Sequence, residues 1–185
     1  MNRRMTLALL LTAAALPGCA ALTARRTEET FSARDYRLAT DDRVRLIVFG
    51  QDDLSNLYTV DGSGAITVPL IGSVEVEGLT TKEAAERVTA RLAGGFLREP
   101  RVTVEIDTYR PFYIMGEVAR GGQYDYVAGM TVETAVAIGG GFTPRAVRSY
   151  ATLSRKVGDE TERFNAPIDY PLRPGDTVIV RERWF

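Results

Sequence analysis

The chain has 185 residues, of which 45% are apolar and 25% are charged, and its formal net charge is −1. These values are typical of a globular protein; they exclude a wholly disordered chain, and the balanced charge indicates no basic patch for nucleic acid. The chain has no His and a single Cys, which excludes Ser-His-Asp and Cys-His catalysis, His-ligated or multi-Cys metal sites and an internal disulfide.

The N-terminus has the layout of a secretory signal. A basic start, Met-Asn-Arg-Arg-Met, is followed by an apolar run over residues 7–16 and then by Leu-Pro-Gly-Cys, which ends at Cys19. The run is shorter than the roughly 20 residues that a membrane-spanning helix needs. Residues 1–18 are therefore predicted to be a signal peptide.

The residues around Cys19 resemble the lipobox of bacterial lipoproteins, in which the Cys is acylated and the chain is cut before it. Leu16 and Gly18 fit that pattern, whereas Pro17 stands where a small residue is more usual. Acylation would tie the mature chain to a membrane through buried lipid chains. By the same resemblance, Ala20 in place of Asp favours sorting to the outer membrane. The alternative is an ordinary signal peptide with an incidental Cys.

The first folded region is predicted over residues 34–109, after a stretch of small, polar and charged residues at 19–33 that is expected to form a lipidated tether. It begins with a strand over residues 43–49, because every second residue from Val44 is apolar.

The composition Asp-Gly-Ser-Gly at residues 61–64 is typical of a tight turn. It predicts a hairpin between strands at residues 58–60 and 65–68, with a further short strand near residues 72–76.

A helix is predicted next, because Thr80 and Glu83 have the spacing of a capping box and Gly94 supplies a stop. Its apolar stripe consists of Ala84, Ala85, Val88 and Leu92. Strict alternation over residues 101–108 then predicts a half-buried strand, which completes a small α+β unit.

The second folded region is predicted over residues 110–185. Its expected elements are strands at residues 112–115, 150–153 and 177–180, a turn at residues 121–124 that leads into another short strand, and a helix capped by Thr131 that runs to Ile138. Strands around one helix in so short a chain indicate a β-grasp-like layout within the α+β class.

One sequence pattern occurs twice. Tyr36-x-Leu38-x-x-x-Asp42-x-Val44 returns as Tyr170-x-Leu172-x-x-x-Asp176-x-Val178, and each copy leads into an apolar strand. No longer repeat surrounds either copy, so we interpret the pattern as a reused way of starting a strand.

The acidic and glycine-rich segments are better explained by turns than by chemistry. The pairs Asp41-Asp42 and Asp52-Asp53 could serve a glycosidase, but neighbours in an extended segment point to opposite faces and Asp is common in turns. Residues 61–64 lack the spaced oxygen ligands of a calcium loop. Residues 139–141, Gly-Gly-Gly, follow a helix where a phosphate loop would precede one. No catalytic residue, metal site or cofactor is predicted.

Several aromatic and basic residues are candidates for binding. Five rings could form a sugar-stacking platform or fill a core, and they are Tyr109, Phe112, Tyr113, Tyr124 and Tyr126. Among them Tyr113 and Tyr124 are the candidate contacts. Three arginines near turns, Arg120, Arg145 and Arg148, are candidates for contact with an acidic glycan or another subunit. The aromatic C-terminus does not fit a transmembrane barrel strand, because counting back by twos gives Arg183 and Arg181.

Several segments together resemble one family, the bacterial polysaccharide export (OPX, Wza-like) outer-membrane lipoproteins. The matching segments lie in order along residues 34 to 185. They are Val-Asp-Gly-Ser-Gly at 60–64, Gly-Leu-Thr at 78–80, Arg-Pro-Phe-Tyr-Ile-Met-Gly-Glu-Val at 110–118, Gly-Gln-Tyr at 122–124, Met-Thr-Val at 130–132, Gly-Gly-Phe-Thr at 140–143 and Pro-Gly-Asp at 174–176.

The resemblance implies a polysaccharide export domain over residues 34–109 and one SLBB domain, a β-grasp fold for soluble ligand binding, over residues 110–185. Two turns depart from the family pattern. Ala-Thr-Asp-Asp at residues 39–42 stands where Gly-Pro-Gly-Asp is usual, and Gly121 stands where a Pro is usual. The longest members add a second SLBB domain and a pore-lining helix. Only one strand follows Asp176 here, so this chain is not expected to cross the membrane itself.

The expected function is that of a lipid-anchored protein on the periplasmic face of the outer membrane, which forms or caps a ring for export of capsular or extracellular polysaccharide. The implied partners are further copies of the chain, an inner-membrane copolymerase and a separate outer-membrane β-barrel. Two alternatives stay open: a glycan-binding SLBB module without a conduit, and a carboxylate-dependent enzyme that cleaves glycan.

Overall fold

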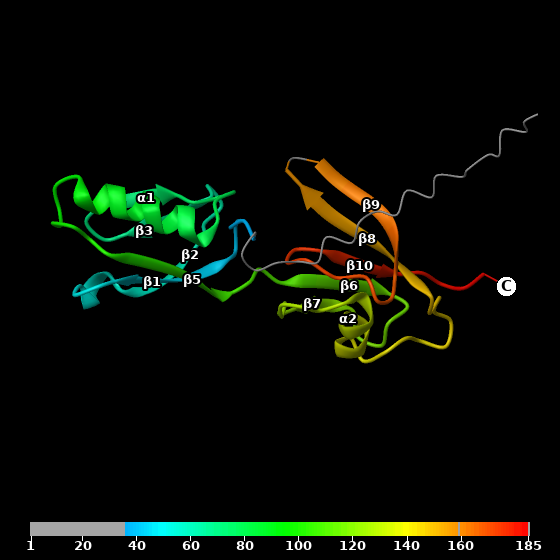
Figure 1. Cartoon of the computed structure of the whole chain (residues 1–185). Coiled ribbons are helices and arrows are strands. Elements are labelled where there is room, and N and C mark those ends of the chain that lie inside the picture. The colour runs from blue at the N-terminus through cyan, green and yellow to red at the C-terminus, as the bar shows by residue number, and fades with distance from the viewer. Residues whose placement is uncertain (1–35, 159, 185) are drawn as a thin grey trace, which may run out of the picture.

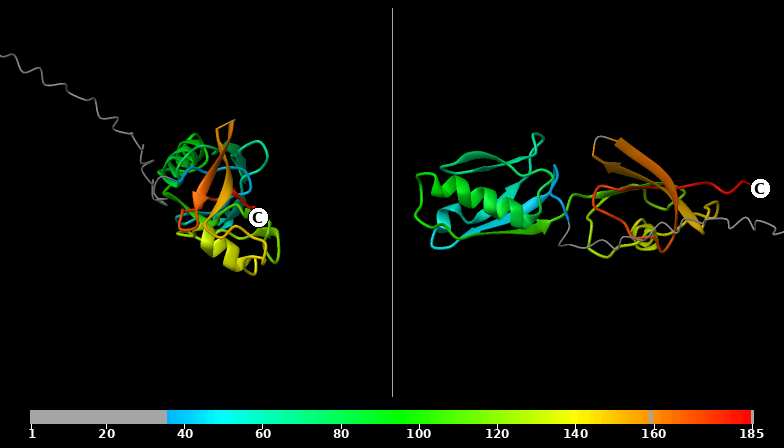
Figure 2. Two further views of the ribbon diagram at one scale, coloured as in Figure 1. Left: turned by 90° about the vertical axis from the view of Figure 1, so that its right-hand side faces the viewer. Right: turned by 45° about the horizontal axis from the view of Figure 1, so that its top comes forward.

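The computed structural model describes residues 36–158 and 160–184; the predicted signal peptide and tether, Cys19 included, lie outside the described residues. Two hydrophobic cores divide the described chain into two lobes. The lobes follow one another along one axis (Figures 1 and 2), and Tyr109 packs against both cores.

The first lobe is built on a three-stranded antiparallel sheet in the order β2-β1-β5. A hairpin of two further strands and one long helix complete it. The elements are β1 (Arg43–Val48), the 3-10 turn η1 (Asp52–Leu54), β2 (Asn56–Thr59), β3 (Ala65–Val68), β4 (Gly72–Glu75), α1 (Thr81–Ala93) and β5 (Val102–Thr108).

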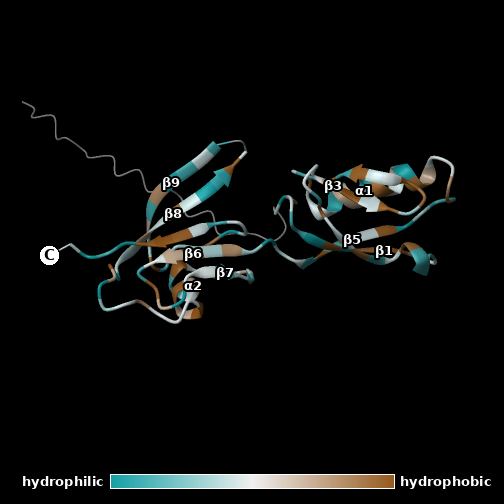
Figure 3. Cartoon of the chain, turned by 180° about the vertical axis from the view of Figure 1, so that it is seen from behind, coloured by the Kyte–Doolittle hydropathy of each residue, from teal (hydrophilic) through white to brown (hydrophobic). Residues whose placement is uncertain are grey.

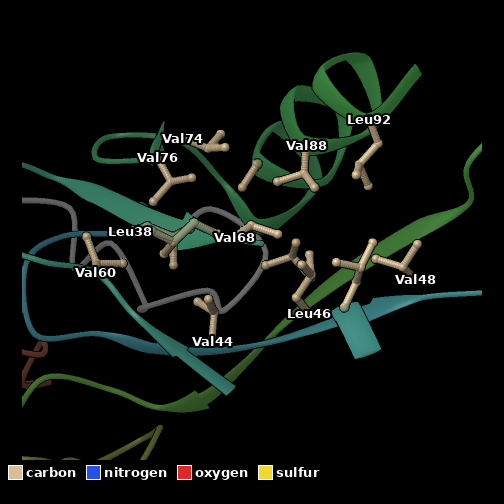
Figure 4. Packing of buried hydrophobic residues seen from close by; sticks show 14 of the residues in the cluster. Leu38, Val44, Leu46, Val48, Val60, Val68, Val74, Val76, Val88 and Leu92 are labelled. Carbon is tan, nitrogen blue, oxygen red and sulfur yellow. The ribbon is translucent and has the colours of Figure 1, made fainter. Parts of the chain in front are cut away.

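The core of the first lobe lies between the sheet and α1 (Figure 4). Val44, Leu46 and Val48 of β1 are buried, and the intervening residues are exposed, as the alternation predicted. Val88 and Leu92 of α1 point toward them. Removal of these apolar side chains from water is the main stabilising contribution of the lobe.

The capping box at the start of α1 is confirmed. The backbone amide of Glu83 donates to Thr80 Oγ1 at 3.2 Å, and the amide of Thr80 donates to Glu83 Oε2 at 2.8 Å. Two backbone donors that have no partner within the helix are satisfied in this way.

The predicted hairpin over residues 58–68 is wrong in its pairing. The turn at residues 61–64 forms, and Asp61 Oδ1 accepts from the amide of Ser63 at 2.8 Å. However, β2 pairs with β1, and β3 pairs with β4. Ala65 and Ile66 of β3 are buried whereas Thr59 of β2 is exposed, so the chain turns away from the sheet to cover the core.

The second lobe contains a five-stranded mixed sheet in the order β7-β6-β10-β8-β9, in which only β6 and β10 are parallel. Its elements are β6 (Phe112–Gly116), β7 (Gly122–Tyr124), α2 (Val132–Ile138), β8 (Tyr150–Val157), β9 (Glu160–Pro167) and β10 (Thr177–Val180). Thr131 and Thr134 form the capping box of α2. Together the two lobes give the chain an α+β fold.

The hairpin of β8 and β9 is longer than the sequence indicated. β8 continues past Leu153 to Val157, and β9 was not predicted, because its outer part is almost wholly exposed and carries no apolar alternation. Figure 3 shows hydrophilic and hydrophobic segments in both strands of this hairpin, with hydrophilic residues common toward its outer end.

The repeated sequence pattern has the same structural role in both lobes. The amide of Leu38 donates to the carbonyl of Leu79 at 2.8 Å, and the amide of Leu172 donates to the carbonyl of Met130 at 2.9 Å. Leu79 and Met130 each precede the N-cap Thr of a helix. Each copy therefore fastens the chain before a central strand to the start of a helix.

Across residues 36–158 and 160–184, no helix has the length and apolar character that would let it span a membrane.

Candidate functional site

A buried carboxylate, Asp42, ties the two lobes together. Its oxygens accept hydrogen bonds from the Tyr36 hydroxyl at 2.7 Å, the amide of Ala39 at 2.8 Å and the amide of Arg110 at 2.8 Å. The Arg110 amide lies in the segment that leads into β6 of the second lobe. Asp42 is fully buried, so burial raises the pKa of its carboxyl, although these donors act in the opposite direction.

Three tyrosine rings pack in a row through the same junction. Tyr36 meets Tyr109 edge to face at 5.0 Å between ring centroids, and Tyr109 meets Tyr126 at 5.5 Å. The Tyr126 hydroxyl donates to the carbonyl of Leu172 at 3.0 Å. Edge-to-face pairs of this kind add to the stability that their buried area provides. The Tyr109 ring is therefore held in a fixed orientation.

The second copy of the repeated pattern holds a buried ion pair. Arg155 donates to Asp176 through Nε at 2.9 Å and through Nη2 at 2.7 Å, and the amide of Arg173 donates to the same carboxylate at 2.8 Å. Burial lowers the pKa of Arg155, but Asp176 and, to a smaller extent, Tyr170 act in the opposite direction, and the net shift is upward. The guanidinium also lies 5.8 Å from the ring centroids of Phe164 and Tyr170.

An open depression lies where the two lobes meet. Its lining includes Asp41, Arg43 and Thr108 of the first lobe, Gln123 and Asp125 of the second, and Tyr109 between them. Ligand sites occur preferentially at such boundaries between structural units.

The positive charge of Arg43 in the depression is balanced by an acidic residue of the same lobe. The Arg43 guanidinium pairs with Asp107 at 2.8 Å, and Arg45 pairs with the other oxygen of Asp107 at 2.7 Å. These two hydrogen-bonded arginines lower the pKa of Asp107. A bulge in the pairing of β1 with β5 places Thr108 opposite Arg43, and the Arg43 guanidinium also donates to the Thr108 hydroxyl at 3.3 Å.

Neither candidate tyrosine lines the depression, although Tyr113 is the strand partner of Gln123, which does. Tyr113 is 41% exposed and stands directly opposite Gln123 in the pairing of β6 with β7. Tyr124 lies on the other face of the sheet, where its ring stacks on Phe112 at 5.9 Å. Two other rings of the predicted sugar-stacking platform, Phe112 and Tyr126, are buried and belong to the core.

The three candidate arginines are exposed but lie on different segments. Arg120 lies in the loop before β7 and packs beside Gly140, whose added Cβ would lie 3.3 Å from Arg120 Nε. Arg145 pairs with Glu182 of the C-terminal segment. Arg148 is exposed in the loop before β8. None of them lines the depression, so the structure does not gather them into one site.

The sequence alone did not identify Asp42 or Asp176 as buried centres of hydrogen bonding. The signal was present in the repeated pattern, since Asp occupies the same place in both copies. In the pair Asp41-Asp42, Asp41 is exposed and Asp42 is buried, and both residues of the pair Asp52-Asp53 are exposed in η1.

The described residues contain no group of three Cys, Asp or Glu side chains that could hold a metal ion. Hydroxyl, amide, carboxylate and aromatic groups suit the junction to hydrogen bonding and stacking.

Two family models match the chain in succession. The model described as "Polysaccharide biosynthesis/export protein" matches residues 31–107, and the model described as "SLBB domain" matches residues 111–165.

Two curated relatives have names that refer to the production or export of polysaccharide. An "Exopolysaccharide production protein ExoF" of Rhizobium meliloti (strain 1021) is 37% identical over 121 residues, which cover 59% of this chain and 29% of the relative. An "EPS I polysaccharide export outer membrane protein EpsA" of Ralstonia nicotianae (strain ATCC BAA-1114 / GMI1000) is 31% identical over 149 residues, which cover 75% of this chain and 39% of the relative. The matched part of the chain therefore spans less than half the length of either relative.

Proposed function

The chain belongs to the polysaccharide biosynthesis/export family, and on this premise we propose that it takes part in the export of a capsular or extracellular polysaccharide. The observation that carries the proposal is the order of the two family matches, which follow the two lobes of the fold. The names of the two relatives, one for exopolysaccharide production and one for polysaccharide export, support the same function.

The proposed mechanism is passage through a conduit, with no bond made or broken by this chain. Several copies would form or cap a ring, and each copy would contribute both lobes as one unit. The hydrogen bond from the Arg110 amide to Asp42 and the ring contacts of Tyr109 with Tyr36 and Tyr126 support this, because contacts between the lobes restrict their relative movement.

The proposed location is the periplasmic face of the outer membrane, with Cys19 as the lipid anchor. The lipobox-like residues around Cys19 support the anchor, and the outer-membrane name of one relative supports the compartment. The proposed partners are an inner-membrane polysaccharide copolymerase and a separate outer-membrane β-barrel that completes the route.

Deletion of the gene in the producing strain tests the function. Surface polysaccharide should be lost and polymer should accumulate in the periplasm, and a plasmid copy of the wild-type gene should restore export. Unchanged surface polysaccharide without periplasmic polymer would contradict the proposal. The ring is tested separately by native mass measurement of the lipidated protein, for which a monomer is the contradicting result.

The enzyme alternative has its own test. Purified protein incubated with the polysaccharide should leave its chain length unchanged. Shortening of the polymer that disappears in Asp52→Asn would instead favour a glycan-cleaving enzyme.

A further inference from the structure

The backbone at Asp41 has a conformation that normally belongs to glycine. Its φ is +72°, in the left-handed region where a side chain crowds the following carbonyl. In the second copy of the repeated pattern, the residue before Asp176 is Gly175, and its φ is +84°. The turn before the central strand thus requires a positive φ in both lobes. The second lobe meets this requirement with the residue that adopts it at no steric cost.

The amide of Asp41 donates to the carbonyl of Val60 at 3.0 Å, but within the described fold the Asp41 side chain makes no contact that offsets the strained φ. Its carboxylate is exposed and has no hydrogen-bond or ion-pair partner among residues 36–158 and 160–184. This contrasts with Asp61, whose side chain accepts bonds from Ser63 and Ala65 in its own turn. Non-glycine residues held in this region of φ cluster at active sites and ligand-binding sites.

The residues around Asp41 carry groups that suit hydroxyl-rich ligands. Asp41 lines the depression between the lobes together with Gln123 and Asp125. The carboxylates accept bonds from hydroxyl groups, and the amide of Gln123 both donates and accepts. Tyr109, fixed between two other rings, lines the depression, and Tyr113 is the strand partner of Gln123, which also lines it. Aromatic rings of this kind pack against the apolar faces of a sugar ring.

The charges of the depression favour an uncharged ligand over an anionic one. The one arginine in its lining, Arg43, is already paired with Asp107, whereas Asp41 and Asp125 add two negative charges to the lining. An acidic sugar or a phosphate would meet net repulsion here. An uncharged sugar would not, because its hydroxyls donate to carboxylates.

We propose that the depression at the junction of the lobes binds uncharged, hydroxyl-rich sugar units of the exported polymer, with the Asp41 carboxylate as a direct acceptor. This rests on the proposed export function. In this proposal, the strained turn at Asp41 serves ligand binding, whereas the corresponding turn at Gly175 serves folding alone.

The test combines binding and stability in one pair of variants. The probe is the set of oligosaccharides released by partial hydrolysis of the polysaccharide from the producing strain, separated by anion exchange into neutral and acidic fractions. Asp41→Gly should raise the thermal midpoint of the purified full chain and weaken binding of the neutral fraction at least tenfold. Asp41→Asn, which tolerates the same backbone and keeps one acceptor oxygen, should retain part of the affinity.

Glu99 provides the matched control. It is also an exposed acidic residue at a positive φ, +47°, and it does not line the depression. Glu99→Gly should raise the midpoint likewise and leave binding unchanged. Addition of 0.5 M NaCl should change the affinity less than twofold, because an uncharged ligand is not screened.

Three results would overturn the inference: unchanged affinity in Asp41→Gly, absence of binding by a neutral fraction, or loss of binding on addition of EDTA, which would indicate a bridging cation. These results are distinguishable from failure of the export function. If gene deletion abolishes export while Asp41→Gly binds and exports as the wild type does, only the sugar site is wrong.

Discussion

The backbone amide of Arg110 donates a 2.8 Å hydrogen bond to the carboxylate of Asp42, although the two residues are 68 positions apart. The bond links the residue that precedes β1 to the segment that connects β5 with β6. The same Arg110 extends its Nε to the carbonyl of Pro174 at 3.1 Å, close to the second copy of the repeated pattern. The two copies are thereby joined at the junction of the lobes.

Substitution of Asp42 should be severely destabilising. Asp42→Ala leaves the Tyr36 hydroxyl and the amides of Ala39 and Arg110 without their acceptor, at a cost on the order of 3 kcal/mol in the free energy of unfolding. Urea denaturation measures this value. Asp52→Ala, at an exposed acidic position, is the control and should change it by less than about 0.5 kcal/mol. Equal effects of the two substitutions would show that the Asp42 bonds contribute nothing.

The buried ion pair of the second lobe should show strong coupling. Arg155→Met leaves the Asp176 carboxylate buried without its cation, and we expect a loss of about 3–5 kcal/mol. The double variant Arg155→Met, Asp176→Asn removes both charges and should recover a large part of that loss. A double-mutant cycle by chemical denaturation gives the coupling energy, and simple additivity of the two changes would refute the expectation.

Alkaline pH should weaken the fold through the buried tyrosines. Burial raises the pKa of Tyr126 to about 12, whereas a tyrosine in the unfolded chain titrates near pH 10. Between these values the unfolded state releases a proton that the folded state retains, so the free energy of unfolding falls as pH rises from about 10 to 12.

Tyr126→Phe should reduce this alkaline loss, whose contribution from Tyr126 is at most about 2.7 kcal/mol. Near pH 7 the same variant should lose about 1 kcal/mol, because it removes the hydrogen bond to Leu172. Unfolding curves between pH 7 and 12 measure both effects. Tyr113→Phe, at an exposed position, serves as the control. An unchanged slope in Tyr126→Phe would exclude Tyr126 as a source of the pH dependence.

Gly116 should tolerate no side chain. Its φ is +90°, and an added Cβ would lie 2.1 Å from the carbonyl oxygen of Val180 on the parallel neighbour β10. Gly129 has a similar φ of +87° with nothing within 4 Å, so Gly129→Ala reports the backbone cost alone. Gly116→Ala should lower the melting temperature clearly more than Gly129→Ala, because the sheet must also separate. Equal shifts would contradict the close approach.

Cys19→Ser tests the lipid anchor. A Ser cannot carry the thioether-linked lipid, so the variant should move from the membrane fraction to the soluble fraction of lysed cells. Radiolabelled fatty acid should enter the wild-type protein and not the variant. A variant that stays with the membranes in high salt would show that attachment does not depend on Cys19.

The sequence by itself determined most of the local elements, with β9 as the main exception. The alternation from Val44 predicted β1 with its buried face, and the Thr80–Glu83 spacing predicted the start of α1. Both signals are local, because side-chain direction along a strand and the unpaired amides at a helix start depend on residues a few positions apart. The segments that resemble the export family also lie within the sequence, and the family matches confirm that resemblance.

Only the tertiary structure decided which of these elements meet. The turn at residues 61–64 is a local signal, but the partners of β2 and β3 were set by burial of Ile66 against the core and not by the turn. Asp41 and Asp42 are neighbours in sequence, yet one is exposed and the other accepts the Arg110 amide. No periodic pattern encodes contacts between residues so far apart, because they depend on how the two lobes pack against each other.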